Sequence, residues 1–254
     1  MICWADLAAK DMRTAATWYQ DAFGWAAIDF DVGPDGGAVL FEVAGKRVAS
    51  ISQASPDPGA PVPQSFWLSY LAVDSVDRAV EQARRAGATL FVPAFDVLDL
   101  GREAILQDPV GALIALWEPR AHRGAELVGV PGSMCWSELV TSEVARAADF
   151  YRTLAGWSIT TESRHGQLTA QIRSGDRLIG GISPPPPSVK ALAPLWLLGL
   201  GAHDCTATER RLIELRGTAV LASRAHHACG QWAWIRDPQG ALFAVVLTPD
   251  NLSG

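Results

Sequence analysis

Hydrophobic and polar positions follow one pattern that occurs four times along the chain. In its first copy, a short, mainly apolar segment at residues 2–8 predicts a β-strand, and a segment with apolar residues at helical spacing follows. Ala15 and Tyr19 lie on the apolar face of that helix, which Asp11 is placed to cap and Gly24 to end. Three more short apolar segments come next, so the pattern predicts a β-α-β-β-β module.

Three further copies complete the chain. Pro-rich segments at 54–64 and 184–194 separate modules within each half, because proline disfavours both helix interiors and central strands. In the last copy, Thr206 and Glu209 have the spacing of a capping box at the start of a helix. The four modules occupy residues 1–55, 64–119, 133–184 and 194–250.

Two segments show that the chain is an internal duplication. CWADLAAKDMRTAATWYQDAFGW at residues 3–25 recurs as CWSELVTSEVARAADFYRTLAGW at residues 135–157, and a DP-x-G-A turn begins at both Asp108 and Asp237. Repeats of this kind indicate repeated structural units. We therefore expect a first domain at 1–119, a linker at 120–132 and a second domain at 133–250, each with its own core and cavity.

Composition and charge narrow the class of protein. The 254 residues carry a formal net charge of −6 and no basic run, which argues against a nucleic-acid or anionic-membrane partner. No apolar run is long enough to span a bilayer, and no secretory signal is visible. Four cysteines without paired spacing fit reduced thiols in a cytoplasm. We expect a cytoplasmic monomer or homodimer.

The four modules, the W-x-[DE]-L strand, the Y-x-x-x-x-GW helix exit and the DP-x-G-A hairpin resemble the glyoxalase/bleomycin-resistance/dioxygenase (vicinal oxygen chelate) superfamily. The resemblance covers essentially the whole chain and is strongest to tandem, two-domain glyoxalase-like proteins. It implies an α+β fold in which each module pair curls an eight-stranded mixed sheet around a cavity, with helices outside. It does not imply one reaction, because the superfamily includes isomerases, ring-cleaving dioxygenases, thiol transferases and drug-binding proteins.

The resemblance also predicts that the superfamily's metal site is absent. Metal-using members take ligands from the first and last strands of their modules. The positions that can be placed here are Trp4, Leu68, Ala115, Trp136, Leu197 and Ala244. None of these side chains offers a lone pair to a cation, which needs three or four donors. We expect no metal and no cofactor.

Strand alternation selects candidate ligand-binding residues. It places Trp4 with Asp6, and Trp136 with Glu138, on the faces that look into the cavities, while Trp67 packs towards a helix. Trp4 and Trp136 either fill a cavity that has lost its metal or stack on a planar ligand. The complete set of candidates is Trp4, Asp6, Leu68, Tyr70, Ala115, Trp117, Trp136, Glu138, Leu197, Ala244, His226 and His227.

Asp6 and Glu138 are also the candidate catalytic residues. A carboxylate on an inward strand position is costly to bury without a partner. It is satisfied structurally, by a side chain of a neighbouring strand or by an arginine, or else it orients a ligand or acts as a general base whose pKa burial raises.

One cluster of side chains has the chemistry of a metal site but not its spacing. His203, Cys205, His226, His227 and Cys229 match no zinc motif, and residues 226–229 fall on a predicted loop. Either these residues lie close in the sequence by chance and are solvated on a loop, or His226 and His227 border the second cavity as acid–base groups.

Two functional hypotheses remain open. The first is metal-independent binding of a small aromatic or apolar metabolite. The ligand would be planar and largely apolar, and its binding would serve sequestration, resistance or an accessory role in biosynthesis. The alternative is an enzyme of the same superfamily (lyase, isomerase, hydrolase or dioxygenase), either cofactor-free or with displaced metal ligands. A binder needs aromatic walls and at most one ionisable group, whereas an enzyme needs two polar groups within reach of one spot.

Overall fold

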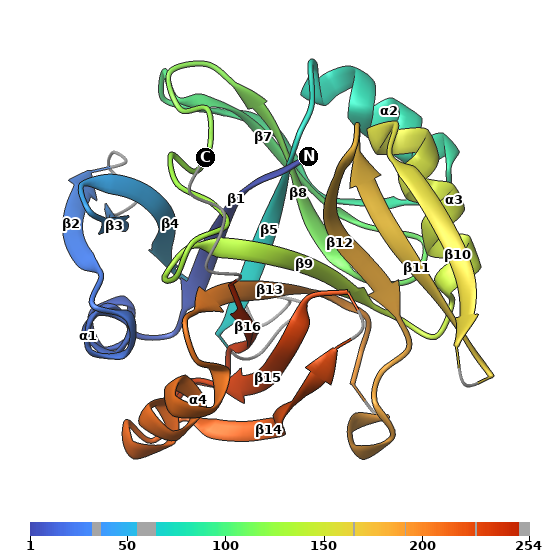
Figure 1. Cartoon of the computed structure of the whole chain (residues 1–254). Helices are drawn as coiled ribbons and strands as arrows, with labels where there is room; N and C mark the ends of the chain where they lie inside the picture. The colour runs from blue at the N-terminus through green and yellow to red at the C-terminus, as the bar shows by residue number, and fades with distance from the viewer. Residues whose placement is uncertain (32–36, 55–64, 165, 191, 227, 249–254) are drawn as a thin grey trace. The chain divides into compact units, whose positions relative to one another are not determined.

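The computed structural model describes residues 1–31, 37–54, 65–164, 166–190, 192–226 and 228–248 (Figure 1). The first half contains β1 (Ile2–Ala9), α1 (Met12–Phe23), β2 (Ala26–Asp31), β3 (Gly37–Val43), β4 (Lys46–Gln53), β5 (Phe66–Ala72), α2 (Val76–Arg85), β6 (Thr89–Val97), β7 (Gly101–Gln107) and β8 (Leu113–Pro119). The second half contains β9 (Met134–Val140), α3 (Val144–Ala155), β10 (Ser158–Arg164), β11 (Gln167–Ser174), β12 (Arg177–Ser183), the 3₁₀ turn η1 (Pro187–Val189), β13 (Leu195–Ala202), α4 (Cys205–Glu214), β14 (Thr218–His226), β15 (Gly230–Arg236) and β16 (Leu242–Leu247).

The strands form two eight-stranded mixed sheets. Their orders are β2-β3-β4-β1-β5-β8-β7-β6 and β10-β11-β12-β9-β13-β16-β15-β14. Within a module the hairpins are antiparallel, whereas its first and last strands pair in parallel, as β1 with β4 and β5 with β8. The predicted α+β class and the four β-α-β-β-β modules are confirmed.

Helix ends follow local chemistry. The Asp11 side chain accepts a hydrogen bond from the Thr14 amide at 3.0 Å, and Gly24 ends α1 in the left-handed conformation with φ 69°. The predicted capping box of the fourth module is wrong. Asp204 caps α4 through the Ala207 amide at 2.9 Å, because its short carboxylate reaches the free amides of the first turn from one residue before the helix.

The packing of the chain forms two compact units that differ from the two halves of the sequence. One unit contains Met1–Cys3, Ser69–Gly124 and Ser137–Leu197, and the other contains Trp4–Leu68, Ala125–Trp136 and Leu198–Gly254. The first thus combines the second and third modules, and the second combines the first and fourth. Separate cores for the two halves were expected, and the packing does not follow that expectation. The domain boundaries and the linker at 120–132 stay predictions.

A buried hydrogen-bonded chain explains how the first and fourth modules join in one unit. Trp67 Nε1 donates to the Tyr19 hydroxyl at 2.9 Å, and that hydroxyl donates to Asp237 Oδ2 at 3.1 Å. Asp237 Oδ1 also accepts from the amides of Gln239 and Ala241 in its own turn. The helix tyrosine of one module therefore holds the DP-x-G-A turn of the other. The hydrogen bond from Trp67 to Tyr19 also shows that Trp67 points towards α1, as strand alternation predicts.

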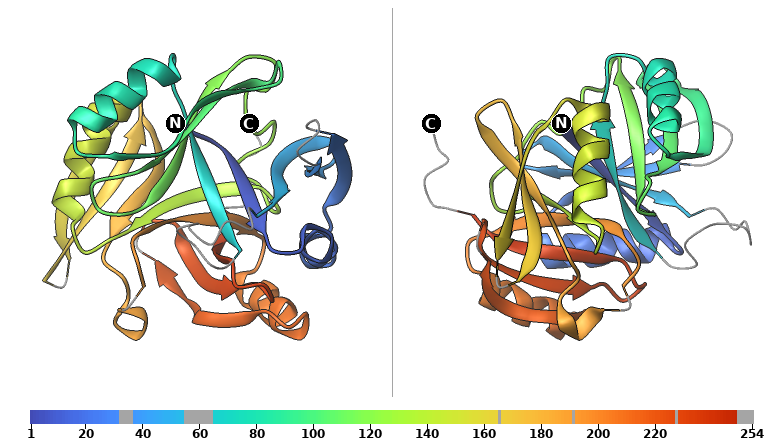
Figure 2. Two further views of the ribbon diagram at one scale, coloured as in Figure 1. Left: turned by 180° about the vertical axis from the view of Figure 1, so that it is seen from behind. Right: turned by 90° about the vertical axis from the view of Figure 1, so that its right-hand side faces the viewer.

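The other unit repeats the arrangement. Trp196 Nε1 donates to the Tyr151 hydroxyl at 2.8 Å, and Tyr151 donates to Asp108 Oδ2 at 2.9 Å. Here the tyrosine belongs to α3 and the turn to the second module. Helices α2 and α3 of this unit lie side by side (Figure 2).

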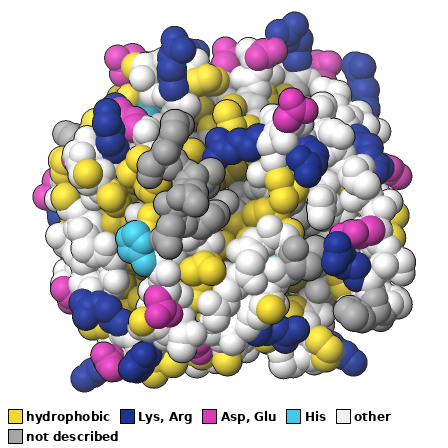
Figure 3. All heavy atoms as spheres, in the orientation of Figure 1, with side chains coloured by type: hydrophobic (Ala, Val, Ile, Leu, Met, Phe, Trp, Pro, Cys, Tyr) yellow, Lys and Arg dark blue, Asp and Glu magenta, His cyan; other side chains and the backbone are white. Residues whose placement is uncertain are grey.

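On the face drawn in Figure 3, neither sign of charge dominates. Lys and Arg side chains are interspersed with Asp and Glu over the face drawn in Figure 3. Among the described residues, none of the helices combines the length and the apolar character that crossing a bilayer requires.

Candidate functional site

The candidate residues of the first strand form a small polar cluster with β4. Parallel pairing places Asp6 opposite Ser50. Trp4 Nε1 donates to Ser50 Oγ at 2.8 Å, Ser50 Oγ donates to Asp6 Oδ1 at 2.5 Å, and Ser52 Oγ donates to Asp6 Oδ2 at 2.6 Å. Trp4 and Asp6 share one face of β1, as the alternation of the strand requires. We call Trp4, Asp6, Ser50 and Ser52 the Asp6 cluster.

The electrostatics of the Asp6 cluster combine two opposing effects. Burial raises the pKa of the Asp6 carboxyl group, and the hydrogen bonds from Ser50 and Ser52 partly offset that rise by stabilising the carboxylate. Side chains of a neighbouring strand thus satisfy Asp6, as one of the two predicted alternatives required. A role in orienting a ligand or as a general base stays a prediction.

The second half has a different residue pair at the equivalent position. Glu138 is only 1% exposed and lies opposite Gly181 on β12. A Cβ atom added at Gly181 would lie 2.6 Å from Glu138 Oε2. The longer carboxylate therefore occupies the space that a side chain at position 181 would take, where the first half has a serine opposite a shorter aspartate.

Two other candidates of the first half come together on β5 and β8. The rings of Tyr70 and Trp117 pack edge to face, with centroids 6.1 Å apart. Trp117 Nε1 donates to the His122 carbonyl oxygen at 2.9 Å, which fixes the indole. Ala115 lies opposite Tyr70 in the strand register and is fully buried. Tyr70 and Trp117 therefore contact each other, and Trp117 is only 4% exposed; their role as a ligand wall stays a prediction.

A third cluster gathers around His226. Its ring lies 3.9 Å from the Trp232 ring and 5.9 Å from the Trp136 ring, measured between centroids. His226 Nδ1 is 2.9 Å from Cys229 Sγ and accepts from the Cys229 amide at 3.2 Å. His226 is the last residue of β14, so the prediction that it lies in a loop is wrong. The antiparallel pairing of β14 with β15 extends to His226 opposite Gly230.

The remaining candidates are buried or undescribed. Leu68, Leu197 and Ala244 are buried, and Ala244 pairs with Gly199 and Trp234 in its sheet. His227 lies outside the described residues.

The four described members of the His/Cys cluster do not gather into a metal site. Cys205 is fully buried, donates to the Gln231 carbonyl oxygen, and has a pKa raised by burial to about 11. Within the described ranges, His, Cys, Asp and Glu side chains form no group of three or more that could hold a metal ion.

The residues at the superfamily's metal positions do not fit a metal either. Trp4 Nε1 is a hydrogen-bond donor to Ser50 and has no lone pair for a cation. Leu68, Ala115, Leu197 and Ala244 are apolar and buried. A metal bound elsewhere in the protein stays untested.

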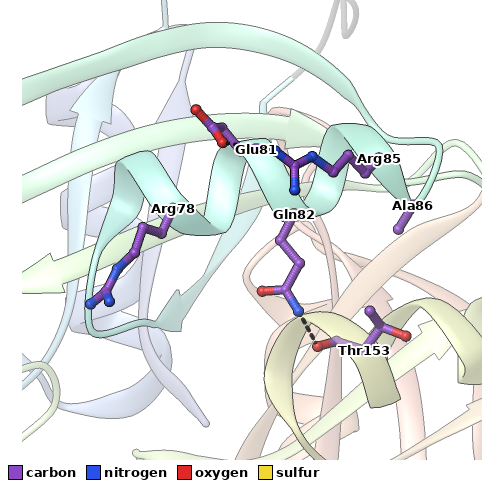
Figure 4. Close-up of a pocket in the computed structure, with 6 residues that line it drawn as sticks. All are labelled: Arg78, Glu81, Gln82, Arg85, Ala86 and Thr153. Atoms are coloured by element: carbon purple, nitrogen blue, oxygen red, sulfur yellow. Dashed lines mark hydrogen bonds and ion pairs between the residues drawn. The ribbon is translucent and has the colours of Figure 1, made fainter.

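A groove beside α2 and α3 was not expected from the sequence. Its volume is about 470 Å³, and Gln82 Nε2 crosses it to donate to the Thr153 carbonyl oxygen at 2.7 Å (Figure 4). The lining residues are Arg78, Glu81, Gln82, Arg85, Ala86 and Thr153. The polar face of α2 is visible in the sequence, but nothing in it signals that α3 lies alongside. None of the predicted site residues lines this groove, whose charged lining consists of two arginines and one glutamate.

Known proteins resemble this chain over nearly its whole length. The sequence model of the Glyoxalase/Bleomycin resistance protein/Dioxygenase superfamily matches residues 2–116. A protein of Mycobacterium tuberculosis (strain CDC 1551 / Oshkosh) named "Putative glyoxylase CFP32" is 34% identical over 247 residues, covering 96% of this chain and 93% of the relative. "Anthracycline biosynthesis protein DnrV" of Streptomyces peucetius is 34% identical over 253 residues, covering 96% of this chain and 91% of the relative.

Solved structures show the same fold at much lower identity. The Mn(II)-bound glyoxalase from Novosphingobium aromaticivorans has a TM-score of 0.66 and 16% identity, covering 97% of this chain and 81% of that protein. This likeness supports the fold and leaves the chemistry to the residues of the chain.

Proposed function

Because the chain belongs to the glyoxalase/bleomycin resistance protein/dioxygenase superfamily, we propose that it binds a planar, largely apolar small molecule without a metal ion. The observation that carries the proposal is Trp4. Where metal-using members of the superfamily place a ligand, this chain has an indole that donates its N–H group to Ser50. The position that would hold a cation therefore holds a buried indole, only 4% exposed, on which a flat ligand inside the cavity would stack.

Aromatic side chains recur at several of the other candidate positions. Tyr70 packs against Trp117, and His226 lies between Trp136 and Trp232 in the ring contacts described above. Tyrosine and tryptophan supply large, rigid surfaces that favour a flat apolar ligand. These groups support a binding role in the first half, the second half, or both.

The name of one relative agrees with this ligand class. The 34% identical protein of Streptomyces peucetius is named for anthracycline biosynthesis. Anthracyclines are fused-ring aromatic compounds, so a planar polycyclic ligand is a reasonable chemical class for this chain too. The same name supports an accessory role in biosynthesis, which is part of the proposal. A cytoplasmic location and a monomeric or homodimeric state remain part of the proposal.

Asp6 favours one alternative, a cofactor-free enzyme. Its pKa is raised by burial, and a carboxylate with a raised pKa is suited to general acid–base catalysis. The cluster brings Asp6 and the Ser52 hydroxyl group within hydrogen-bond reach of one another. Turnover of a bound compound by the wild type, lost in Asp6→Asn, would favour this alternative over simple binding.

Native mass spectrometry of the purified protein, combined with elemental analysis, tests the proposal. We expect a retained organic molecule of a few hundred daltons, or an empty protein, and no stoichiometric Zn, Fe, Mn or Ni. About one such metal ion per domain, surviving dialysis against a chelator, would contradict metal-independent binding.

A further inference from the structure

The turn between β14 and β15 brings a thiol and an imidazole into contact. His226 ends β14 opposite Gly230, the first residue of β15, and Cys229 lies in the turn between them. Cys229 Sγ lies 2.9 Å from His226 Nδ1, within hydrogen-bond distance. Both residues are only half-buried, so the pair is within reach of small molecules from solution.

The backbone of the turn indicates which nitrogen of His226 is the base. The amides of Ala228 and Cys229 donate to His226 Nδ1 at 3.4 and 3.2 Å. A nitrogen that accepts hydrogen bonds carries a lone pair, so we assign the proton of the neutral ring to Nε2. The lone pair of Nδ1 therefore faces the Cys229 thiol and can take its proton.

Two tryptophan rings lie beside the imidazole. The His226 ring centroid is 3.9 Å from that of Trp232 and 5.9 Å from that of Trp136. An indole stabilises a nearby cation, which favours the imidazolium that forms when His226 takes a proton. The same two rings make the neighbourhood apolar, so it suits an uncharged reactant better than a charged one.

The other three cysteines have different surroundings. Cys135 is also half-buried, but its thiol lies 3.4 Å from two backbone carbonyl oxygens, which accept a hydrogen bond without taking the proton. Burial raises the pKa of the Cys3 and Cys205 thiols to about 11. Because the thiolate is the reactive form of a cysteine, these contacts favour Cys229 as the nucleophile of the chain.

We propose that Cys229, with His226 as its base, is a covalent modification site that adds to uncharged α,β-unsaturated carbonyl compounds. A cysteine paired with a histidine is a nucleophile activated by an adjacent general base. The inference does not depend on the proposed binding function, because it requires the thiol and its base and no bound planar ligand.

The addition balances with the two side chains alone. Sγ forms a bond to the β-carbon of the reactant, the electrons of its C=C bond move onto the carbonyl oxygen as an enolate, and His226 Nδ1 takes the thiol proton. The imidazolium then returns that proton to the α-carbon, which leaves a neutral thioether and a neutral imidazole. An addition has no leaving group and needs no oxidant or reductant, so one base that takes and returns a proton is sufficient.

The rate of addition of N-ethylmaleimide to each cysteine tests the proposal on the full-length protein at pH 7. N-ethylmaleimide is an uncharged α,β-unsaturated carbonyl compound, and mass spectrometry of peptides measures all four cysteines in one sample. His226→Gln keeps a hydrogen-bonding side chain and removes the base. His203→Gln makes the same change at an exposed histidine just before α4 and is the matched control.

We expect Cys229 of the wild type to react at least about tenfold faster than Cys135, because a positioned general base accelerates proton transfer by more than this. In His226→Gln the Cys229 rate should fall to about that of Cys135. His203→Gln should keep the wild-type rates. The fully buried Cys205 reports the state of each variant, since its rate rises only if the variant unfolds.

The comparison of Cys229 with Cys135 in the wild type requires no variant. Equal rates at these two half-buried thiols would overturn the proposal. A Cys229 rate that stays high in folded His226→Gln, or that falls as much in His203→Gln, would also overturn it, because exposure alone would then explain the reactivity.

Discussion

At the scale of single residues, the buried aspartates of the two DP-x-G-A turns act as hydrogen-bond hubs. Asp108 Oδ1 accepts from the amides of Val110 and Ala112, while its Oδ2 accepts from the Tyr151 hydroxyl group. Asp237 has the equivalent arrangement with Tyr19. Burial raises the pKa of both carboxyl groups, and the hydrogen bonds partly offset it. Both aspartates therefore hold their turns against helices.

Asp108→Asn tests this role. The amide oxygen still accepts from the turn, but its NH₂ group faces a Tyr151 hydroxyl that already accepts from Trp196 and needs an acceptor of its own. We expect the free energy of unfolding in urea to fall by about 1–3 kcal/mol at pH 7. The exposed control Asp21→Asn should stay within about 0.5 kcal/mol of the wild type.

The pH dependence of that loss has a definite sign. A carboxyl group whose pKa is raised by folding binds more protons in the folded state than in the unfolded one. Its contribution to stability is therefore largest below the unfolded pKa, about 4, and falls as the pH rises through the folded pKa. The stability difference between wild type and Asp108→Asn should thus be larger at pH 4 than at pH 7. A difference that grows with pH would contradict the assignment.

At the scale of elements, the strand pair β1–β4 and its counterpart β9–β12 carry different side chains at one equivalent position. A serine opposes an aspartate where β4 meets β1, and a glycine opposes a glutamate where β12 meets β9. The extra methylene of Glu138 requires the missing side chain of Gly181, because an added Cβ atom would lie 2.6 Å from Oε2 and 3.2 Å from the Ala170 carbonyl oxygen. Packing against Glu138, rather than a turn, therefore explains why a glycine lies inside β12.

Gly181→Ala should therefore destabilise the protein by about 1–3 kcal/mol through overpacking. Shortening the opposing side chain relieves the overlap, so Glu138→Asp in the Gly181→Ala background should recover part of the loss. A double-mutant cycle in urea measures that coupling. If the two substitutions are additive, Glu138 does not occupy the space at position 181.

Local sequence signals predicted most elements, and tertiary contacts explain the exceptions. Asp11 caps α1 as the sequence predicts, and Ser75 caps α2 in the same way. Thr206 does not cap α4, because Asp204 is an equally good capping residue and the pattern cannot choose between them. β6 extends to Val97, because Phe95 pairs with Glu103 across the hairpin. Such pairing is not visible in the residues of one strand.

At the scale of the whole molecule, the internal duplication predicts the fold but not which modules pack together. The helix tyrosines and the turn aspartates each occur twice with equivalent chemistry. Spacing alone cannot show that Tyr19 bonds Asp237 rather than Asp108. The sheets follow the halves of the sequence, whereas the compact units combine modules from both halves. Independent cores were therefore a natural expectation that only the tertiary contacts could correct.

A half-chain of residues 1–119 tests this packing. It would lack Asp237 for the Tyr19 hydroxyl, the Leu215 carbonyl oxygen for Trp18 Nε1 at 2.7 Å, and the Gly132 carbonyl oxygen for Trp25 Nε1 at 2.7 Å. Because buried polar groups without partners are costly, we expect weak near-UV circular dichroism and no cooperative unfolding in urea. The full-length chain should unfold cooperatively. A sharp transition in the half-chain would show that each half has a core of its own.

The candidate site was predictable only to the level of single residues. Alternation placed Trp4 with Asp6, and the structure joins them through Ser50. The serines were missed because an isolated serine in a strand carries no signal, and their role depends on the parallel register of β1 and β4. Cys229 was assigned to chance, and its contact with His226 depends on where β14 ends.

The most direct test of metal-independent binding is a calorimetric titration of the full-length protein with 2-naphthol. The titration is repeated after exhaustive dialysis against EDTA, and again with added Mn²⁺ or Zn²⁺. If the Trp4 position holds an indole instead of a metal ligand, the dissociation constant should be the same within about twofold in all three conditions. Binding that disappears after EDTA treatment and returns with the metal would contradict the central claim.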